Sequence, residues 1–177
     1  MLLDSDDPAL AQQALDHYRE HYVEIGLFEN QLYDGIREIL AEFSGQGQRL
    51  YVATAKPETF ARRVITYFEL DEFFSDIYGP TLEGLRNDKR DLLGYLMAKT
   101  DLVPASAVMI GDRKHDIQAA LAHGITSIGV CYGFGSPAEL SAAGCDYLVD
   151  NVTDLHQLLR RLCPRAIPER NRSDLQD

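Results

Sequence analysis

The sequence lacks the residues that mark several classes of protein. It has no tryptophan and only three cysteines among 177 residues. Cys131, Cys145 and Cys163 are odd in number and show no Cys-x-x-Cys spacing. A disulfide framework or a zinc site is therefore not indicated, and we expect reduced thiols.

Basic charge and long apolar runs are also scarce. Lys and Arg number 17 against 28 Asp and Glu, which gives a formal net charge of -11 with His neutral. This balance argues against nucleic acid and anionic membranes as partners. The longest apolar runs, such as residues 105–111, are too short to span a bilayer, and Met1–Asp7 has no features of a signal peptide. We therefore predict a soluble, cytoplasmic protein.

What the sequence does contain is the composition of an ordinary globular domain, with 45% hydrophobic and 25% charged residues. Two helices are predicted first, over residues 8–26 and 35–43. Strands and helices then alternate, which predicts an α/β fold with a parallel sheet and helices on both faces. The strands are expected at 49–53, 76–78, 107–110, 127–130 and 147–149, and the helices at 57–69, 88–100, 114–123, 137–143 and 153–162.

Two of these strands consist of short apolar runs, Leu50–Ala53 and Ala107–Ile110, without alternation. Such runs are typical of strands that are buried on both faces of a parallel sheet. In open α/β sheets, ligands bind beyond the carboxyl ends of the strands. We therefore examined the residues that follow each strand.

The first strand is followed by Thr54-Ala55-Lys56-Pro57. A hydroxyl group and backbone N–H groups meet the start of a helix here, and this combination favours an anion. Taken alone, a threonine before a helix is more often only a helix cap.

A second motif, Gly111-Asp112-x-x-x-Asp116, follows the strand at 107–110. Gly111 allows a sharp turn, and the two carboxylates lie one helical turn apart. Paired hard oxygen ligands of this kind suit Mg²⁺. In the alternative interpretation Asp112 caps the helix and Asp116 is solvated, but two adjacent acids without a cation would repel each other.

The third feature is Lys89, which begins a helix after a turn-rich loop. A cation in the first turn opposes the helix dipole, and a nearby anion would compensate for this cost. Alone, Lys89 would more often be an ordinary surface lysine. The joint order of Thr54, Lys89 and the paired acids within one alternating fold makes the combination informative.

This order resembles the second, third and fourth motifs of the haloacid dehalogenase (HAD) superfamily of phosphatases. Residues 16–22, 26–30 and 32–36 are similar to the later part of the helical cap in phosphoglycolate phosphatase-like members, and residues 122–136 to the section after the fourth motif. The resemblance covers nearly the whole chain. It implies a partial helical cap at 1–46 and a HAD-like Rossmannoid core at 47–163, and we expect a mobile tail at 164–177.

The resemblance also implies roles for individual residues. Thr54, with the backbone around Ala55, would hold the phosphoryl oxygens, and Lys56 would line the entrance. Lys89 would neutralise the phosphate and the nucleophile, so Thr54 and Lys89 are the expected catalytic residues. Asp112 would bind Mg²⁺, with Asp116 completing the metal site. The implied reaction is the hydrolysis of a small phosphorylated metabolite, with phosphoglycolate and nucleoside monophosphates both open.

The family's first motif, an apolar strand that ends in Asp-x-Asp-Gly-Thr and supplies the nucleophile, does not occur in this sequence. Asp4-Ser5-Asp6 has the spacing, but only three residues precede it and Asp7-Pro8 replaces Gly-Thr, so we interpret it as a coincidence. In the family this strand lies between those that end at Thr54 and Asp112. We therefore expect a gap in the sheet, a chain that is a fragment of a longer protein, and impaired catalysis.

Three alternatives use similar residues. A non-catalytic phosphate-binding or interaction module would use the gap to accept a strand from a partner or from a second copy, giving a homodimer. A dehalogenase shares the scaffold but needs no metal, so the paired acids argue against it. In a receiver-type signalling domain the acid pair precedes the Thr and Lys, whereas here it follows them.

Overall fold

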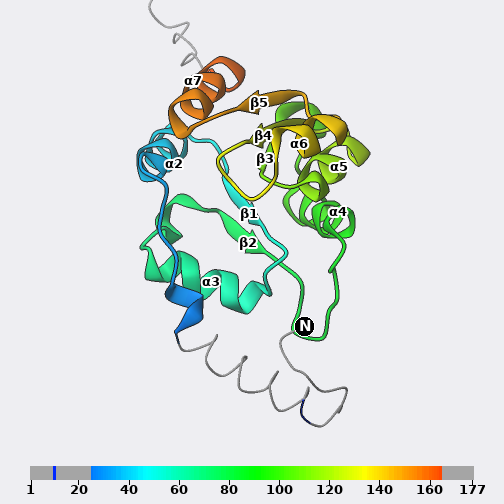
Figure 1. Cartoon of the computed structure of the whole chain (residues 1–177). Coiled ribbons are helices and arrows are strands. Elements are labelled where there is room, and N and C mark those ends of the chain that lie inside the picture. Colours follow the sequence, from blue (N-terminus) through cyan, green and yellow to red (C-terminus); the bar gives the residue numbers. More distant parts are fainter. Residues whose placement is uncertain (1–9, 11–24, 165–177) are drawn as a thin grey trace, which may run out of the picture. The chain divides into compact units, whose positions relative to one another are not determined.

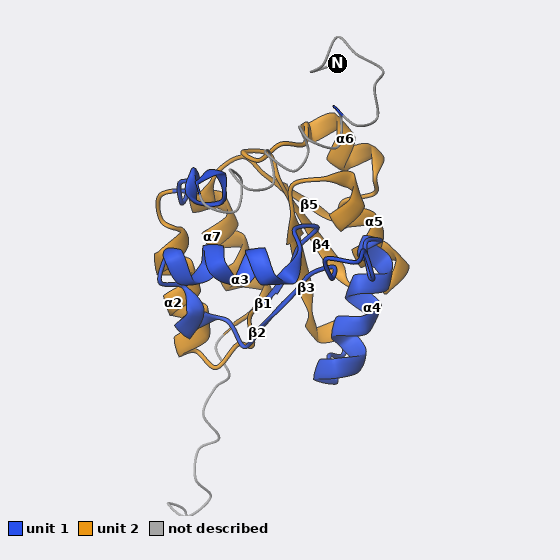
Figure 2. Cartoon of the chain, turned by 90° about the horizontal axis from the view of Figure 1, so that it is seen from below, with its two compact units in different colours: residues 1–33, 51–103 blue, residues 34–50, 104–177 orange. Residues whose placement is uncertain are grey.

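The computed structural model describes residue 10 and residues 25–164 (Figure 1). The predicted helix at 8–26 and the Asp4-Ser5-Asp6 segment lie almost entirely outside these residues, as does the predicted tail apart from Pro164. The described chain divides into two compact units, coloured separately in Figure 2. Unit 1 contains residues 1–33 and 51–103, and unit 2 contains residues 34–50 and 104–177.

Unit 1 is built on a pair of parallel strands. Strand β1 (Tyr51–Ala53) pairs with β2 (Asp76–Tyr78), with Val52 opposite Ile77. Its α-helices are α3 (Glu58–Tyr67) and α4 (Lys89–Thr100), and its 3₁₀ helices, labelled η, are η1 (Gly26–Phe28) and η2 (Asp71–Phe73). Leu92 and Leu96 lie one turn apart on α4 and pack with Tyr78 into an apolar cluster, because residues four apart share one face of a helix.

Unit 2 contains a sheet of three parallel strands in the order β3-β4-β5. The strands are β3 (Val108–Gly111), β4 (Thr126–Val130) and β5 (Tyr147–Val149), and the helices are α2 (Ile36–Gly45), η3 (Pro104–Ser106), α5 (Lys114–Ala122), α6 (Pro137–Ala142) and α7 (Val152–Leu162). Its core joins α2, β4, β5 and α7 through Ile39, Phe43, Ile128, Val130, Val149, Leu155, Leu158 and Leu159.

The element predictions for the described residues are confirmed, with boundaries that shift by one or two positions. The strands at 76–78 and 147–149 coincide with the prediction, and the helix predicted at 57–69 is α3, which ends earlier. Glu69, two residues beyond the end of this helix, has a left-handed backbone (φ 53°). Local patterns therefore determined most of the elements.

The prediction that both apolar strands are buried on both faces is wrong. Strand β4 is almost entirely buried, whereas every residue of β1 and β3 is at least partly exposed, and Ile110 reaches 42%. The reason lies in the topology of the described strands, since β4 has a neighbour on each side while β1 and β3 each pair on one side only.

The predicted helix at 35–43 is present as α2, but its packing groups it with the strands of unit 2. Ile39 and Phe43 of α2 belong to the same apolar cluster as Ile128 and Leu155. The predicted division into a cap at 1–46, a core at 47–163 and a tail at 164–177 stays a prediction. The three cysteines are free thiols, and none of the described helices has the length and hydropathy needed to cross a membrane.

Candidate functional site

The carboxyl end of β1 holds Thr54 in a tight turn. The Thr54 N–H donates to the carbonyl of Tyr78 at 3.0 Å, which continues the pairing of β1 with β2 beyond the strand. The Thr54 hydroxyl oxygen Oγ1 accepts a hydrogen bond of 3.1 Å from the Lys56 N–H. Gly79 lies against this turn, since a Cβ there would be 2.5 Å from the Lys56 carbonyl oxygen. The chain thus brings Thr54, Ala55 and Lys56 around one strand end.

Lys89 reaches the same strand end from α4. Its Nζ donates to the carbonyl of Ala53 at 2.6 Å, across 36 positions of sequence. Asp88 precedes it as the N-cap, and its side chain accepts from the N–H groups of Arg90 and Asp91. The cap fixes the start of the helix, and the lysine extends from its first residue. Unit 1 therefore brings the predicted Thr54 and Lys89 together.

The paired acids lie in unit 2, where β3 leads into α5. Asp116 is 7% exposed, and its Oδ2 accepts a hydrogen bond of 3.1 Å from the Arg113 N–H. A Cβ on Gly111 would lie 2.2 Å from the Asp116 Cβ, so this position has room only for glycine. The suggestion that Asp112 caps the helix and Asp116 is solvated is therefore wrong, because the buried Asp116 makes the capping contact.

Asp112 is held by a loop that follows β4. Its Oδ2 accepts a hydrogen bond of 2.8 Å from the Phe134 N–H. The flanking glycines come very close, since a Cβ on Gly133 would lie 2.3 Å from the Asp112 Cβ and one on Gly135 would lie 2.0 Å from the Asp112 carbonyl oxygen. The loop positions one carboxylate oxygen and leaves Oδ1 with no hydrogen-bond partner among the described residues.

Sequence reasoning assigned no role to Gly133, Phe134 or Gly135. The signal that could have indicated one is the Gly-x-Gly spacing that begins three residues beyond the buried strand β4, since glycines allow close backbone approach. The contact itself joins residues 22 positions apart and depends on the sheet. The Phe134 side chain is 91% exposed beside this carboxylate.

An ion pair fixes α5 against α6 next to the paired acids. The Arg113 Nε donates to Glu139 Oε1 at 3.0 Å, and the Lys114 N–H donates to the same oxygen at 3.0 Å. The backbone N–H of Lys114 and the guanidinium of Arg113 lower the pKa of Glu139 below its ordinary value. Glu139 therefore remains charged and anchors the start of α5.

The predicted residues thus form two half-sites, one in each unit. We call the residues predicted to hold phosphate, Thr54, Ala55, Lys56 and Lys89, the phosphate half-site, and we call Asp112 and Asp116 the acid half-site. No group of three or more His, Cys, Asp or Glu suited to a metal ion occurs within the described part of the chain. Two carboxylates alone still fit Mg²⁺, which commonly takes one or two protein carboxylates and completes its shell with water and phosphate oxygens.

Both half-sites lie at the carboxyl ends of parallel strands, which is where ligands bind in α/β proteins. Residues 2–130 match the model of the haloacid dehalogenase-like hydrolases. The chain therefore belongs to the haloacid dehalogenase-like hydrolase family.

The relatives of this chain include enzymes of phosphate chemistry. A 5'-nucleotidase of Pseudomonas aeruginosa is 42% identical over 153 residues, which cover 86% of this chain and 69% of the relative. A phosphoglycolate phosphatase of Colwellia psychrerythraea is 31% identical over 155 residues, which cover 88% of this chain and 69% of the relative. The tyrosine-protein kinase PtkA of Mycobacterium tuberculosis is 40% identical and covers 71% of this chain but only 43% of its own length.

The fold is also found in solved structures. The crystal structure of a predicted phosphatase from Clostridium acetobutylicum superposes with a TM-score of 0.81 at 39% identity, covering 88% of this chain and 72% of that one. The predicted fold class is therefore confirmed, and phosphatase relatives support enzymatic function at the level of the family.

Proposed function

We propose that this chain carries the phosphate-binding and metal-binding parts of a Mg²⁺-dependent phosphomonoesterase of the phosphoglycolate phosphatase-like type. Thr54 and Lys89 are assigned to the phosphoryl group, with Ala55 and Lys56 lining its approach. Asp112 and Asp116 are assigned to the metal. The substrate class is a small phosphorylated metabolite, and the relatives support both nucleoside monophosphates and phosphoglycolate.

The observation that carries the proposal is the contact of Lys89 with the end of β1. Its Nζ lies 2.6 Å from the carbonyl of Ala53, the residue before Thr54, so a cation and a hydroxyl group lie at one strand end. Phosphoryl transfer needs mainly positioned positive charge and hydrogen-bond donors, because charge develops on the phosphoryl oxygens. Lys89 supplies the charge, and Thr54 supplies a hydroxyl donor.

The acid half-site fits the proposed metal by its donor chemistry. Both groups are carboxylates, and each has one oxygen held by a backbone N–H. Asp112 retains an oxygen without a hydrogen-bond partner among the described residues, as a metal ligand requires. When bound, Mg²⁺ would neutralise charge on the phosphoryl group. Asp116, buried beneath Gly111, would orient the site.

Catalysis by the chain as written is proposed to be impaired. Removal of a nucleophile from a cooperating set of residues commonly costs on the order of 10⁴-fold or more in rate. The 177 residues contain no Asp-x-Asp-Gly-Thr, and the Thr54 and Lys89 half-site contains no carboxylate assigned to attack. We therefore expect this chain to bind phosphate and to turn substrate over slowly or not at all.

The test compares this chain with a version extended by the coding sequence upstream of Met1. Phosphate release from phosphoglycolate, a nucleoside monophosphate and p-nitrophenyl phosphate is measured with and without Mg²⁺. We expect Mg²⁺-dependent activity in the extended form and little in the chain as written, and we expect Asp112→Asn to abolish the activity. The proposal would be wrong if the extended form were inactive and the Asp112→Asn variant bound Mg²⁺ with unchanged affinity.

A second candidate function rests on the unpaired sides of β1 and β3. Each of these strands pairs with only one neighbour among the described residues. A module that captures an extended segment at such an edge would bind through main-chain hydrogen bonds. We expect a capture module to lose its partner when Ile110, which is 42% exposed on β3, is changed to Lys. An Ile110→Lys variant with unchanged binding partners would remove this candidate.

A further inference from the structure

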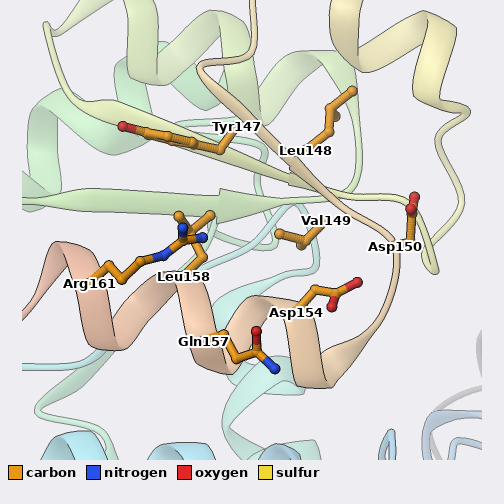
Figure 3. Close-up of a pocket in the computed structure, with 8 residues that line it drawn as sticks. All are labelled: Tyr147, Leu148, Val149, Asp150, Asp154, Gln157, Leu158 and Arg161. Atoms are coloured by element: carbon orange, nitrogen blue, oxygen red, sulfur yellow. The ribbon is translucent and has the colours of Figure 1, made fainter.

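A hollow of about 230 Å³ lies in unit 2, and its lining includes none of the residues assigned to phosphate and metal. It is bounded by β5 and α7, and Figure 3 shows the side chains that line it. Tyr147 on β5 and Arg161 on α7 lie toward one end, and Asp150 and Asp154 lie toward the other. The hollow therefore carries positive charge at one end and negative charge at the other.

The strand beside this hollow has an open hydrogen-bonding edge. The carbonyl of Val149 accepts a hydrogen bond from the Cys131 N–H at 2.9 Å, so the backbone N–H and C=O groups of Val149 point toward β4. The direction of these groups alternates along a strand. Those of Tyr147 therefore also point toward β4, and those of Leu148 point away from it. Among the described strands, only β4 pairs with β5. Leu148 thus presents one donor and one acceptor at the edge.

This edge has only one of the usual protections against pairing, its short length. Many natural edge strands also carry charged residues, proline or a bulge, whereas the three residues of β5 read Tyr-Leu-Val. Tyr147 and Leu148 are each 40% exposed. An apolar edge of this kind is suited to a short pairing with another strand.

The charges beside the edge indicate which strand pairs with β5. Helix α7 runs back along β5, so Asp154 in its first turn lies near the carboxyl end of β5 and Arg161 in its last turn lies near the amino end (Figure 3). If two copies of β5 pair antiparallel about a twofold axis, the amino end of one strand meets the carboxyl end of the other. Arg161 of each copy then meets Asp154 of its partner, as an isologous interface requires.

We propose that this chain forms a twofold-symmetric dimer by antiparallel pairing of β5 with β5 of a second copy. Leu148 faces Leu148 across the axis, and each donates its N–H to the carbonyl of the other. Two Arg161–Asp154 ion pairs flank these hydrogen bonds. No intramolecular hydrogen bond or ion pair occupies the Arg161 guanidinium within the described residues, so its charge is available to the second copy. Asp154 Oδ2 accepts a hydrogen bond of 2.7 Å from Asn151 Nδ2, which leaves its other carboxylate oxygen for Arg161 of the second copy.

The two-copy arrangement explains the charge pattern better than an unrelated peptide would. A peptide would need an acid and a base at a fixed spacing, whereas a second copy supplies both automatically because the hollow is complementary to itself after a half-turn. Because β5 has only three residues, the interface is small, and the dimer should dissociate on dilution.

The test measures the mass of the purified chain by sedimentation equilibrium over a range of concentrations. We expect a monomer–dimer equilibrium that Arg161→Glu weakens by about tenfold or more, since like charges then face each other twice. Asp154→Arg should weaken it similarly. The double variant Arg161→Glu/Asp154→Arg should restore the dimer, because both pairs are re-formed with opposite polarity.

Two further variants separate this interface from other effects. Leu148→Pro removes the edge N–H without removing a bond to β4, and it should abolish the dimer while the thermal melt shows a folded protein. Lys99→Glu makes the same change of charge on the exposed face of α4 and should leave the equilibrium unchanged. A chain that stays monomeric at all concentrations, a dimer that Leu148→Pro leaves intact, or a double variant that does not recover would each overturn the proposal.

Discussion

The ammonium group of Lys89 combines a structural contact with an expected chemical role. One of its three donors is engaged by the carbonyl of Ala53, at the strand end where Thr54 follows. A cation at the start of a helix opposes the helix dipole, and the Ala53 carbonyl offsets part of that cost. The same contact holds the charge beside the Thr54 hydroxyl.

Replacing Lys89 by Met keeps the length of the side chain and removes its charge. We expect Lys89→Met to weaken the binding of inorganic phosphate by tenfold or more and to lower the free energy of unfolding by about 1.5–3 kcal/mol, the usual worth of a hydrogen bond to a charged group. Isothermal titration calorimetry with phosphate and urea unfolding give the two values. Lys99→Met, on the exposed face of the same helix, is the matched control. Equal phosphate affinity in both variants would remove Lys89 from the site.

The loop glycines around Asp112 provide a second prediction at this scale. A Cβ on Gly135 would lie 2.0 Å from the Asp112 carbonyl oxygen, whereas one on Gly45 would have nothing within 4 Å. We expect Gly135→Ala to displace the loop, to weaken Mg²⁺ binding, and to cost about 1–3 kcal/mol in stability. Gly45→Ala, the control, should be neutral or slightly stabilising. Mg²⁺ titration calorimetry and thermal melts compare the two, and equal behaviour would show that the loop yields without disturbing Asp112.

Beside the apolar contacts between α2 and α7, one carboxylate of α2 contacts two side chains of α7. Glu42 Oε2 lies 2.6 Å from the Arg160 guanidinium and 2.7 Å from His156 Nε2. The hydrogen bond from Arg160, aided by that from His156, lowers the pKa of Glu42 from 4.5 to about 2. The charged form is therefore favoured in the folded state, and its contribution to stability is present above pH 4.5 and is lost as the pH falls toward 2.

Glu42→Gln should accordingly lower the melting temperature at pH 7. The difference between the variant and the original chain should shrink as the pH falls from 4.5 to 2, because protonation removes the same interaction from the original chain. Thermal melts at a series of pH values measure this difference. Glu38→Gln on the same helix is the control and should have the smaller effect at pH 7. A difference that stays constant across this range would show that the Glu42 contacts do not stabilise the fold.

Elements with a strong local pattern could be predicted from the sequence, and their pairing could not. Strand β5 and helix α7 follow from apolar runs, turn residues and caps within a few positions. The exposure of Ile110 follows instead from which strands lie beside β3, and this depends on residues far away in the sequence. The same limit applies to the site, where Asp112 was found from its spacing while its contact with Phe134 crosses 22 positions.

At the scale of the whole chain, each unit has an apolar cluster of its own. Unit 1 packs Leu92 and Leu96 of α4 against Tyr78 of β2. Unit 2 packs Ile128 of β4 against α2 and α7. Because burial of apolar side chains is the main favourable term in folding, each cluster should determine the stability of its own unit first.

Leu96→Ala tests this division directly. Leu96 is 2% exposed, and its truncation should cost about 2–5 kcal/mol. We expect hydrogen exchange, followed by mass spectrometry, to accelerate in peptides from residues 51–103 and to change much less in peptides from 104–164. Ile128→Val in unit 2 is the reciprocal variant, with an expected cost of about 0.5–1.5 kcal/mol and the opposite distribution of exchange. If either substitution accelerated exchange equally throughout the described chain, the two units would unfold as one, and the phosphate and acid half-sites would share a single cooperative structure.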